Sequence, residues 1–531
     1  MRNKEIGKIL DGALSLTVSA LVVKILGVIY KVPLSYILGD AGMGYFNTAY
    51  TVYGFFYVLC SAGVPKAITC IISESKTEDE VSGIFAYSLR FFILVGAALC
   101  GVLMLSAPLI VYLIGNEGAL ATLMVIGPSV LFVASGGVCR GYLAAAGRLS
   151  PIAISQVIEA VCKLAMGILF ARIGAHISLP KTHIAALAVL GITFGSCLSA
   201  LYLLLSCKIR ITKYKAGQSK VKNGKEIVKR LLKIAVPITV GSSVLTLSSL
   251  IDMTLTMRCL QGIGIDTMEA NEIYGNYTTL AVPMFNLVIS LITPLTVRLL
   301  PELIKKRDDA REFGRELNRT LTITAALVAP CACVYYLYSF DLLDILFSSA
   351  QSARGFEMLS ALAISLFFLC ILNVTNTAHE ANGRFGVPIL SLSVGTLMKV
   401  IVEPLLILFT PLGVLGVPVS TLISHFVGLL ISVVLLFKDG VRINLGVGCV
   451  LPMLASSLAF ILTYRLIYPL GGFFGGLAGV ITLWIMSSIL YIVMLILCWW
   501  IAFRMENKVK MTKFLSRGTK QSRLFLVNRT K

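Results

Sequence analysis

Charged side chains stand in the middle of apolar runs at a few positions of this sequence. Glu159 and Lys163 lie within "SQVIEAVCKLAMGILF", Lys399 and Glu403 lie within "LMKVIVEPLLIL", and Lys24 lies within "LVVKILGVIYKVPL". A charge at the centre of a bilayer costs about 2.5–3.5 kcal/mol on the insertion scale, so such residues usually face a bundle interior or a wet cavity. Cations outnumber acids in these runs, and that balance favours a hydrated anion such as phosphate, which lysine binds as a point charge.

Eight polar or charged residues form the candidate substrate-binding set. Lys24 and Lys31 are seven positions apart, so they share one helical face, two turns from each other. The acids nearest to them in sequence lie outside residues 12–39, and none is available to neutralise them locally. The full set is Lys24, Lys31, Asn47, Glu159, Lys163, Arg258, Lys399 and Glu403.

The two glutamate–lysine pairs also have a purely structural interpretation. Glu159 and Lys163, like Lys399 and Glu403, are spaced i,i+4 on a helix, so each pair is able to neutralise itself. The acid precedes the lysine in one pair and follows it in the other. This reversal indicates that the position of the lysine is conserved between the two copies while that of the acid is not. The structural and the substrate-binding interpretations of these pairs both stay open.

Structural alternatives also exist for three other charged or titratable residues. Lys31 is placed where its side chain would snorkel to the outer interface. Arg258 is positioned as an anchor at the outer end of its span, and His425 as a hydrogen-bonded packing residue. Lys24 is harder to explain in this way, since it lies about ten residues from either end of its span.

The composition predicts an all-α polytopic membrane protein. The 531 residues are 57% hydrophobic and only 14% charged, against about 25% charged in soluble domains. Apolar runs of about 20 residues, the length that a helix needs to cross the hydrocarbon core, recur along the chain. Because lipid leaves no partner for free backbone groups, these runs must be helices, and they are too continuous for barrel strands. We predict fourteen spans, at 10–31, 44–72, 86–114, 119–146, 151–174, 183–207, 231–259, 273–300, 316–339, 357–378, 387–410, 414–437, 447–468 and 474–502.

The distribution of basic residues predicts the orientation. Of the net charge of +20, much lies in the segment 208–233, with ten Lys/Arg and one acid, and in 504–531, with nine Lys/Arg and one acid. The positive-inside rule then places both termini in the cytoplasm of a bacterial cell membrane. Attraction to anionic membrane lipids explains the basic segments without a nucleic-acid partner. We expect a monomer.

Metal, disulfide and cofactor chemistry find no support in the sequence. The thirteen cysteines are scattered through the spans, without a CxxC motif or a Cys/His cluster at metal-ligand spacing. They are interpreted as small apolar residues. No cofactor is predicted, and coupling to an ion or to the membrane potential is left open.

Two internal matches indicate that the chain is a duplication. "AAGRLSPIAISQVIEAVCK" from 145 aligns with "ANGRFGVPILSLSVGTLMK" from 381, which brings Lys163 onto Lys399, and 45–65 aligns with 274–294 at a similar shift. Six spans per copy give parallel repeats about an axis along the membrane normal, with substrate sites at the repeat interface and rocking lobes. The predicted parts are an N-lobe at 1–207, a basic cytoplasmic linker at 208–230, a C-lobe at 231–437, spans thirteen and fourteen at 438–503, and a basic cytoplasmic tail at 504–531.

The motifs "KILGVIYKVPLSYILGDAGMGYFNTAY", "SAGVPKAI", "AAAGRLSP" and "EANGRFGVP" carry a family resemblance. With them the chain resembles the oligosaccharide-flippase branch of the multidrug/oligosaccharidyl-lipid/polysaccharide exporter superfamily, near stage V sporulation protein B, with the MurJ-type lipid II flippases as cousins. The resemblance implies movement of an undecaprenyl-pyrophosphate-linked sugar from the inner to the outer leaflet. It also implies pyrophosphate binding by cations of the first span, where Lys24 stands in place of the usual arginine. The last two helices would form a groove for the lipid tail.

The expected function is therefore a flippase for a lipid-linked oligosaccharide or a lipid II-like peptidoglycan precursor, and not an enzyme. A cation-coupled multidrug exporter of the same fold is the first alternative, although its cavity would require acids where span one has lysines. A membrane-embedded glycosyltransferase would usually show paired carboxylates and a large outer domain, whereas the outer loops here are short. A scaffold for envelope assembly is the remaining alternative.

Overall fold

A computed structural model gives the structure of residues 2–75, 77–211, 224–347, 349–441, 443–467 and 482–497. Within these residues the chain consists of helices joined by turns and short loops, with no strand. The helices are α1 (Arg2–Ser61), α2 (Gly63–Glu74), α3 (Glu78–Ile114), η1 (Glu117–Ala119), α4 (Leu120–Ile126), α5 (Ser129–Ala145), α6 (Leu149–His176), α7 (Lys181–Ile211), α8 (Gly224–Gly262), α9 (Thr267–Asn276), η2 (Tyr277–Ala281), α10 (Val282–Lys305), α11 (Ala310–Leu337), α12 (Ser339–Leu346), α13 (Ser349–Ala381), α14 (Gly386–Phe409), η3 (Gly413–Leu415), α15 (Gly416–Lys438), η4 (Gly446–Val450) and α16 (Leu451–Ile467).

The prediction of an all-α membrane protein is confirmed. In the described part of the chain, twelve helical segments are long and apolar enough to cross a membrane, and a shorter apolar helix follows at Thr482–Leu497. The first of these segments, Val22–Glu74, contains the second predicted span and residues 22–31 of the first, and each later segment falls on one predicted span. Hydropathy therefore located the spans, because each needs a continuous run of apolar residues.

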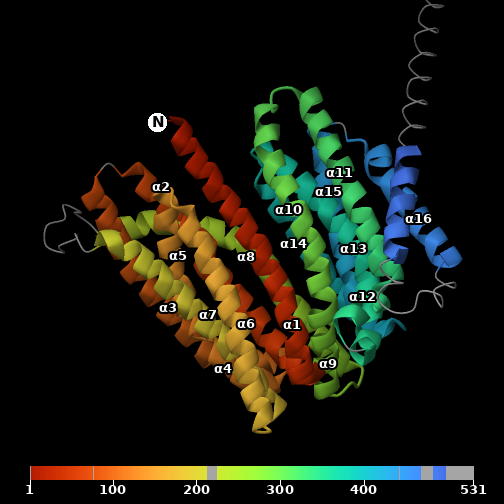
Figure 1. Cartoon of the computed structure of the whole chain (residues 1–531), viewed down its shortest axis with the longest axis horizontal. Coiled ribbons are helices and arrows are strands. Elements are labelled where there is room, and N and C mark those ends of the chain that lie inside the picture. The colour runs from red at the N-terminus through yellow and green to blue at the C-terminus, as the bar shows by residue number, and fades with distance from the viewer. Residues whose placement is uncertain are drawn as a thin grey trace, which may run out of the picture. The chain divides into compact units, whose positions relative to one another are not determined.

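Helix α1 consists of two helices joined at a sharp kink (Figure 1). Gly39 stands at the junction with φ 67° and ψ −176°, a backbone conformation that only glycine adopts readily. The kink lets the residues before Gly39 and the residues after it belong to two spans without an intervening loop. We call these parts α1a (2–38) and α1b (40–61).

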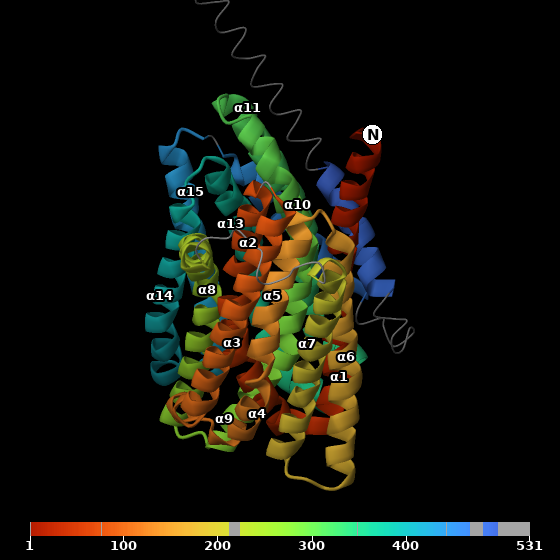
Figure 2. The same ribbon diagram turned by 90° about the vertical axis from the view of Figure 1, so that its left-hand side faces the viewer.

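The contacts divide the chain into two compact units. Unit 1 comprises the described parts of Met1–Ser290, Leu346–Leu362 and Ile389–Gly428. A hydrophobic cluster in this unit joins α2, α3, α5, α7 and α8 through buried residues such as Ile68, Phe85, Val138, Leu203 and Leu231. Figure 2 shows α3 running beside α5 in this unit. This packing gives the helices that carry the site a fixed frame.

Helices α1b and α9 approach each other closely within unit 1. A side-chain carbon added at Gly275 would lie 2.6 Å from the Asp40 carbonyl oxygen, and one added at Gly44 would lie 2.3 Å from the Asn271 carbonyl oxygen. Small residues at such crossings are the usual device of membrane helices, because they let two backbones meet. The crossing brings α9 and η2 against α1b, where the candidate site lies.

Unit 2 comprises the described parts of Leu291–Ile345, Ala363–Pro388 and Leu429–Lys531. A cluster around Tyr338, Phe460, Leu483 and Tyr491 joins the end of α11, α16 and the helix Thr482–Leu497. The Tyr491 hydroxyl donates a hydrogen bond of 2.9 Å to the Ala326 carbonyl oxygen. The helices of predicted spans thirteen and fourteen thus pack on α11 of the same unit.

The two turns matched in the predicted duplication have the same local structure. Gly147 and Gly383 have φ of 67° and 76°, and the amides of Arg148 and Arg384 donate to the Leu143 and His379 carbonyls, each five residues earlier. The duplication and the domain boundaries themselves stay predictions. The predicted linker falls largely on 212–223 and the predicted tail on 504–531, and both of these ranges lie outside the described residues.

Candidate functional site: a lysine-lined cavity in unit 1

A cavity of about 480 Å³ lies among α1a, α1b, α6, α8, α9, η2 and the start of α10. This volume is within the range of about 300–1,000 Å³ that small-molecule sites occupy. The charged residues in its lining are Lys24, Lys31, Lys163 and Asp252. Asn47 lines it too, so half of the eight candidates from the sequence meet here.

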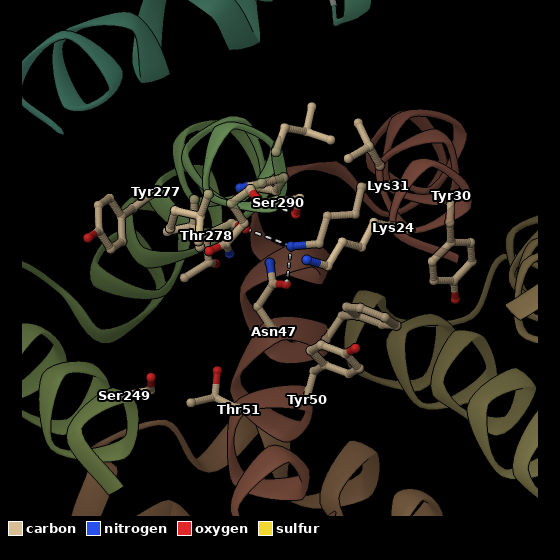
Figure 3. A pocket seen from close by; sticks show the side chains of 18 of the residues that line it. Lys24, Tyr30, Lys31, Asn47, Tyr50, Thr51, Ser249, Tyr277, Thr278 and Ser290 are labelled. Carbon is tan, nitrogen blue, oxygen red and sulfur yellow. Dashed lines mark hydrogen bonds between the residues drawn. The ribbon is translucent and has the colours of Figure 1, made fainter. Parts of the chain in front are cut away.

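Lys31 turns its ammonium group into this cavity rather than away along the helix (Figure 3). Nζ donates hydrogen bonds to the Thr278 carbonyl oxygen at 2.7 Å and to Asn47 Oδ1 at 3.2 Å. The Asn47 amide in turn donates to Thr279 Oγ1 at 2.8 Å. This chain of contacts fixes Lys31 between α1b and η2, which argues against the reading that it snorkels to the outer interface.

Lys24 lines the same cavity from a position two helical turns before Lys31 on α1a. In the view of Figure 3 both lysine side chains extend toward Asn47. Lys24 is exposed to the hollow interior, where it lines this cavity and a second one of about 520 Å³. Among the described residues it has no carboxylate partner, so its charge is available to a ligand.

Lys163 is held by aromatic rings. Its Nζ lies 4.2 Å from the centre of the Tyr50 ring and 5.6 Å from that of Tyr30. A cation over an aromatic face is stabilised by about 0.5–2 kcal/mol, depending on its desolvation. The rings orient the ammonium without cancelling its charge.

Glu159 is paired with a residue that the sequence reading overlooked. Its Oε2 accepts a hydrogen bond from Arg140 Nη2 at 3.1 Å, and the two side chains are 22% and 13% exposed. The interpretation that Glu159 and Lys163 neutralise each other is therefore wrong. Glu159 pairs with Arg140 on α5, and Lys163 contacts the tyrosine rings of α1. A lone arginine within the apolar run "LFVASGGVCRGYLAAAG" was the signal that could have revealed Arg140.

Lys399 and Glu403 belong to a buried cluster with Asp252. Lys399 Nζ forms an ion pair with Asp252 on α8, donates to Thr421 Oγ1 at 2.7 Å, and lies 3.9 Å from Glu403 Oε2. The Lys399 side chain is 9% exposed and that of Glu403 is 0% exposed. The i,i+4 pair thus exists, but Asp252 is the nearer partner, and neither Lys399 nor Glu403 lines the cavity.

Glu403 is satisfied by hydroxyl groups of two neighbouring helices. Thr256 Oγ1 donates to its Oε1 at 2.9 Å, and Ser420 Oγ donates to its Oε2 at 3.2 Å. Buried carboxylates require such partners, because an unsatisfied charge in a medium of low dielectric constant is costly. The cluster therefore has the bonding of a structural element, and through Asp252 it touches the cavity.

Arg258 and His425 lie apart from the lysine-lined cavity. The Arg258 guanidinium donates to the carbonyl oxygens of Leu113, at 2.9 Å, and of Tyr112, at the end of α3. These contacts agree with the anchor interpretation, and a role in binding gains no support from them. The His425 ring stacks on Phe285 with ring centres 6.2 Å apart.

The electrostatic balance of the lysine-lined cavity favours an anion. Its lining carries three lysines against Asp252, whose carboxylate is already paired with Lys399. Like charges repel strongly where the dielectric constant is low. A bound anion would relieve the repulsion among Lys24, Lys31 and Lys163, whereas a bound cation would add to it.

Residues 9–305 match the family model described as "Polysaccharide biosynthesis protein". The stage V sporulation protein B of Bacillus subtilis (strain 168) is 22% identical over 421 residues, which cover 77% of this chain and 79% of that protein. The lipid II flippase MurJ of the same organism is 26% identical over 169 residues, 30% of this chain and 31% of that protein.

A solved structure has the same fold. The lipid II flippase MurJ in an inward closed conformation superposes with a TM-score of 0.69 at 17% identity, covering 92% of this chain and 98% of the other. The likeness confirms the predicted MurJ-like fold. The family match extends over more than half of the chain and includes α1, α6, α8 and α9 of the site. The chain belongs to the polysaccharide biosynthesis protein family, in the flippase branch of the multidrug/oligosaccharidyl-lipid/polysaccharide exporter superfamily.

Proposed function

We propose that this protein is a flippase that moves an undecaprenyl-pyrophosphate-linked oligosaccharide or lipid II-like precursor from the inner to the outer leaflet. The pyrophosphate binds in the lysine-lined cavity, where Lys24, Lys31 and Lys163 surround it. Asn47 positions Lys31, and the Tyr50 ring positions Lys163. Transport of this kind breaks no covalent bond. The protein supplies a polar path for a headgroup that the hydrocarbon core would exclude.

One observation carries this proposal. Three ammonium groups from α1a and α6 line one cavity, and the acid that shares it is engaged by Lys399. A pyrophosphate offers two adjacent anionic groups, and charge-assisted hydrogen bonds to such groups are about twice as strong as neutral ones. The arrangement therefore suits a doubly anionic headgroup better than a neutral or cationic one.

The substrate class is supported by the relatives. The family is described by polysaccharide biosynthesis, and the MurJ relative is named a lipid II flippase. For this chain we infer a lipid-linked glycan, both termini in the cytoplasm, and two lobes that rock to expose the cavity to each side in turn.

The prenyl tail is assigned to the last helices. In unit 2, α16 lines an apolar cavity of about 190 Å³ together with α11 and α13. Its lining is formed by residues such as Ala329, Phe367 and Met453. A segment of hydrocarbon chain would gain stability there by packing against these apolar side chains.

The proposal is tested by flipping in liposomes that contain the purified protein. The substrates are a fluorescent undecaprenyl-pyrophosphate-linked glycan, the same lipid with a monophosphate, and a fluorescent organic cation. We expect translocation of the pyrophosphate lipid, at least tenfold slower movement of the monophosphate lipid, and none of the cation.

A matched pair of lysine variants serves as the control. Lys163→Met removes a charge from the cavity, whereas Lys66→Met removes one from the exposed face of α2 and should leave transport unchanged. Translocation of the cation but not of the glycan lipid would replace the proposal by a drug exporter. Equal transport by the Lys163→Met variant and the wild type would contradict the proposal that the lysine-lined cavity binds the pyrophosphate.

A further inference from the structure

The second cavity of unit 1 has a lining of a different chemical kind. It has a volume of about 520 Å³ and shares Lys24, Gly27, Tyr30, Tyr50 and Lys163 with the lysine-lined cavity. It extends from these shared residues along α1a, α1b, α6 and α7 toward Ala20, Tyr57 and Gln156. The two cavities are therefore adjacent, and Lys24 and Lys163 stand at their boundary.

Aromatic rings form one wall of this second cavity. Tyr50, Tyr53 and Tyr57 follow each other along α1b, with ring centres 6.2 Å and 5.7 Å apart, and Tyr30 lies across from them on α1a. The spacing of three and four residues puts the rings on one face of the helix. Tyr50 remains 39% exposed although it lies inside the unit, so its ring is open to the cavity.

Polar groups able to donate and accept hydrogen bonds form another part of the lining, on α6. Gln156 Oε1 accepts a hydrogen bond from Ser19 at 3.4 Å, which leaves its amide N–H groups available to a ligand within the described structure. Glu159 uses Oε2 for Arg140, and its Oε1 is available as an acceptor. Both side chains lie on α6, on the face that lines the cavity.

This combination matches the chemistry of a sugar ring. A pyranose has faces of C–H groups that pack on aromatic rings, and hydroxyl groups at its edge that donate and accept hydrogen bonds. Binding sites of this kind combine an aromatic lining with a few well-placed polar groups. A tyrosine offers both a broad apolar face and a polar tip, which suits an amphipathic ligand better than phenylalanine or leucine would.

We propose that the second cavity is the subsite for the sugar attached to the pyrophosphate. This inference rests on the proposed function, because it requires the phosphate groups to lie between Lys24 and Lys163, where the two cavities join. The sugar then packs against the rings of Tyr50 and Tyr57, which the buried Tyr53 supports from between them, and exchanges hydrogen bonds with Gln156 and Glu159. The lysines recognise the feature common to all pyrophosphate lipids, and the tyrosine wall recognises that a glycan is attached.

The test compares two lipids on the purified full-length protein in nanodiscs. One is undecaprenyl pyrophosphate, and the other is undecaprenyl-pyrophosphate-linked N-acetylglucosamine. We expect the wild type to bind the sugar-bearing lipid at least tenfold more tightly. Gln156→Leu and Tyr57→Leu should each reduce that preference about fivefold, the effect of one lost hydrogen bond or ring contact, and leave the affinity for the sugar-free lipid unchanged.

Two controls separate this inference from the proposed function. Tyr36→Leu removes an exposed tyrosine of α1a outside both cavities and should alter neither affinity. Lys24→Ala should weaken both lipids by the same factor. Equal affinity of the wild type for the two lipids, or an unchanged preference in both wall variants, overturns the sugar subsite and leaves the flippase proposal intact. Binding of neither lipid by the wild type overturns the proposed function and the subsite with it.

Discussion

Glu159 forms its ion pair with Arg140 on α5, and not with Lys163 one turn away on its own helix. The pair ties α5 to α6 across the interior of unit 1. It also leaves Lys163 without a carboxylate partner among the described residues, with its ammonium on the Tyr50 ring. The acid in the middle of this apolar run is therefore paired with Arg140, and the lysine beside it keeps its charge for the cavity.

The first prediction follows from the Arg140–Glu159 pair. Glu159→Gln should leave the Arg140 charge buried and unpaired, and breaking such a pair costs about 3–5 kcal/mol. The double variant Arg140→Gln, Glu159→Gln should recover most of that loss, whereas Lys163→Met combined with Glu159→Gln should recover none. Thermal unfolding of the purified protein in detergent measures each variant. Recovery by Lys163→Met instead of Arg140→Gln would restore the i,i+4 interpretation.

The second prediction concerns Lys24 as an anion ligand. Lys24→Ala should insert and fold normally, because removing an isolated charge from the membrane relieves about 2.5–3.5 kcal/mol. It should nevertheless lose about ten- to a hundredfold in flipping, the value of a hydrogen bond to a charged group. Lys24→Arg should retain part of the activity, since charge matters more here than shape, and Lys24→Glu should retain none.

Complementation of a flippase-depleted strain, with membrane abundance measured by immunoblot, checks the Lys24 series. Full rescue by Lys24→Ala at normal abundance would show that this cavity does not select for phosphate through Lys24.

The sequence predicted the spans for one physical reason and part of the site for another. Spans follow from continuous apolar runs, which are local properties of the chain. Lys24 and Lys163 were identified because a charge in such a run is costly wherever it lies. The partners of the charged residues could not be identified in this way. Arg140 pairs with Glu159, Asp252 pairs with Lys399, and Tyr50 lies beside Lys163. Each partner comes from another helix, so the contact depends on how the helices pack. The sequence indicates only pairs along one helix, such as residues spaced i,i+4. For Glu159 this spacing predicted the wrong partner.

The third prediction concerns the buried cluster of Lys399, Asp252 and Glu403. Lys399→Met should leave two carboxylates without their cation and lower stability by about 3–5 kcal/mol. Adding Asp252→Asn should restore more stability than adding Glu403→Gln, because Asp252 is the nearer partner and Glu403 also has Thr256 and Ser420 as donors. Unfolding temperatures of the single and double variants decide between the two partners, and a larger rescue by Glu403→Gln would contradict the assignment.

The fourth prediction uses Asn47, which holds Lys31 at 3.2 Å. Asn47→Asp should place a carboxylate beside the Lys31 ammonium and cancel one of the positive charges of the cavity. At a separation of about 4 Å, unit charges interact by about 4 kcal/mol at the effective dielectric constant typical of protein sites. Flipping of the pyrophosphate lipid should therefore fall at least tenfold. Asn47→Ser, which keeps a neutral hydrogen-bonding group, should fall much less. Equal activity of the aspartate and serine variants would mean that the charge on Lys31 does not act on the substrate.

The fifth prediction tests the orientation of the chain. Tags at residue 1, within 213–224 and at residue 531 should all be cytoplasmic, because the basic residues concentrate in 208–233 and 504–531 and such segments stay inside. A tag within 263–270, the segment between α8 and α9 with the first residues of α9, should be outside. Accessibility of introduced cysteines to an impermeant thiol reagent provides the measurement in intact cells, in a background where native exposed cysteines such as Cys70 are replaced. With this orientation α1a runs outward from Lys24 to Lys31, so a headgroup that leaves Lys24 meets Lys31 on its way out. Labelling of 263–270 from the cytoplasmic side would reverse that order, and Lys31 would then be the first lysine that the headgroup meets.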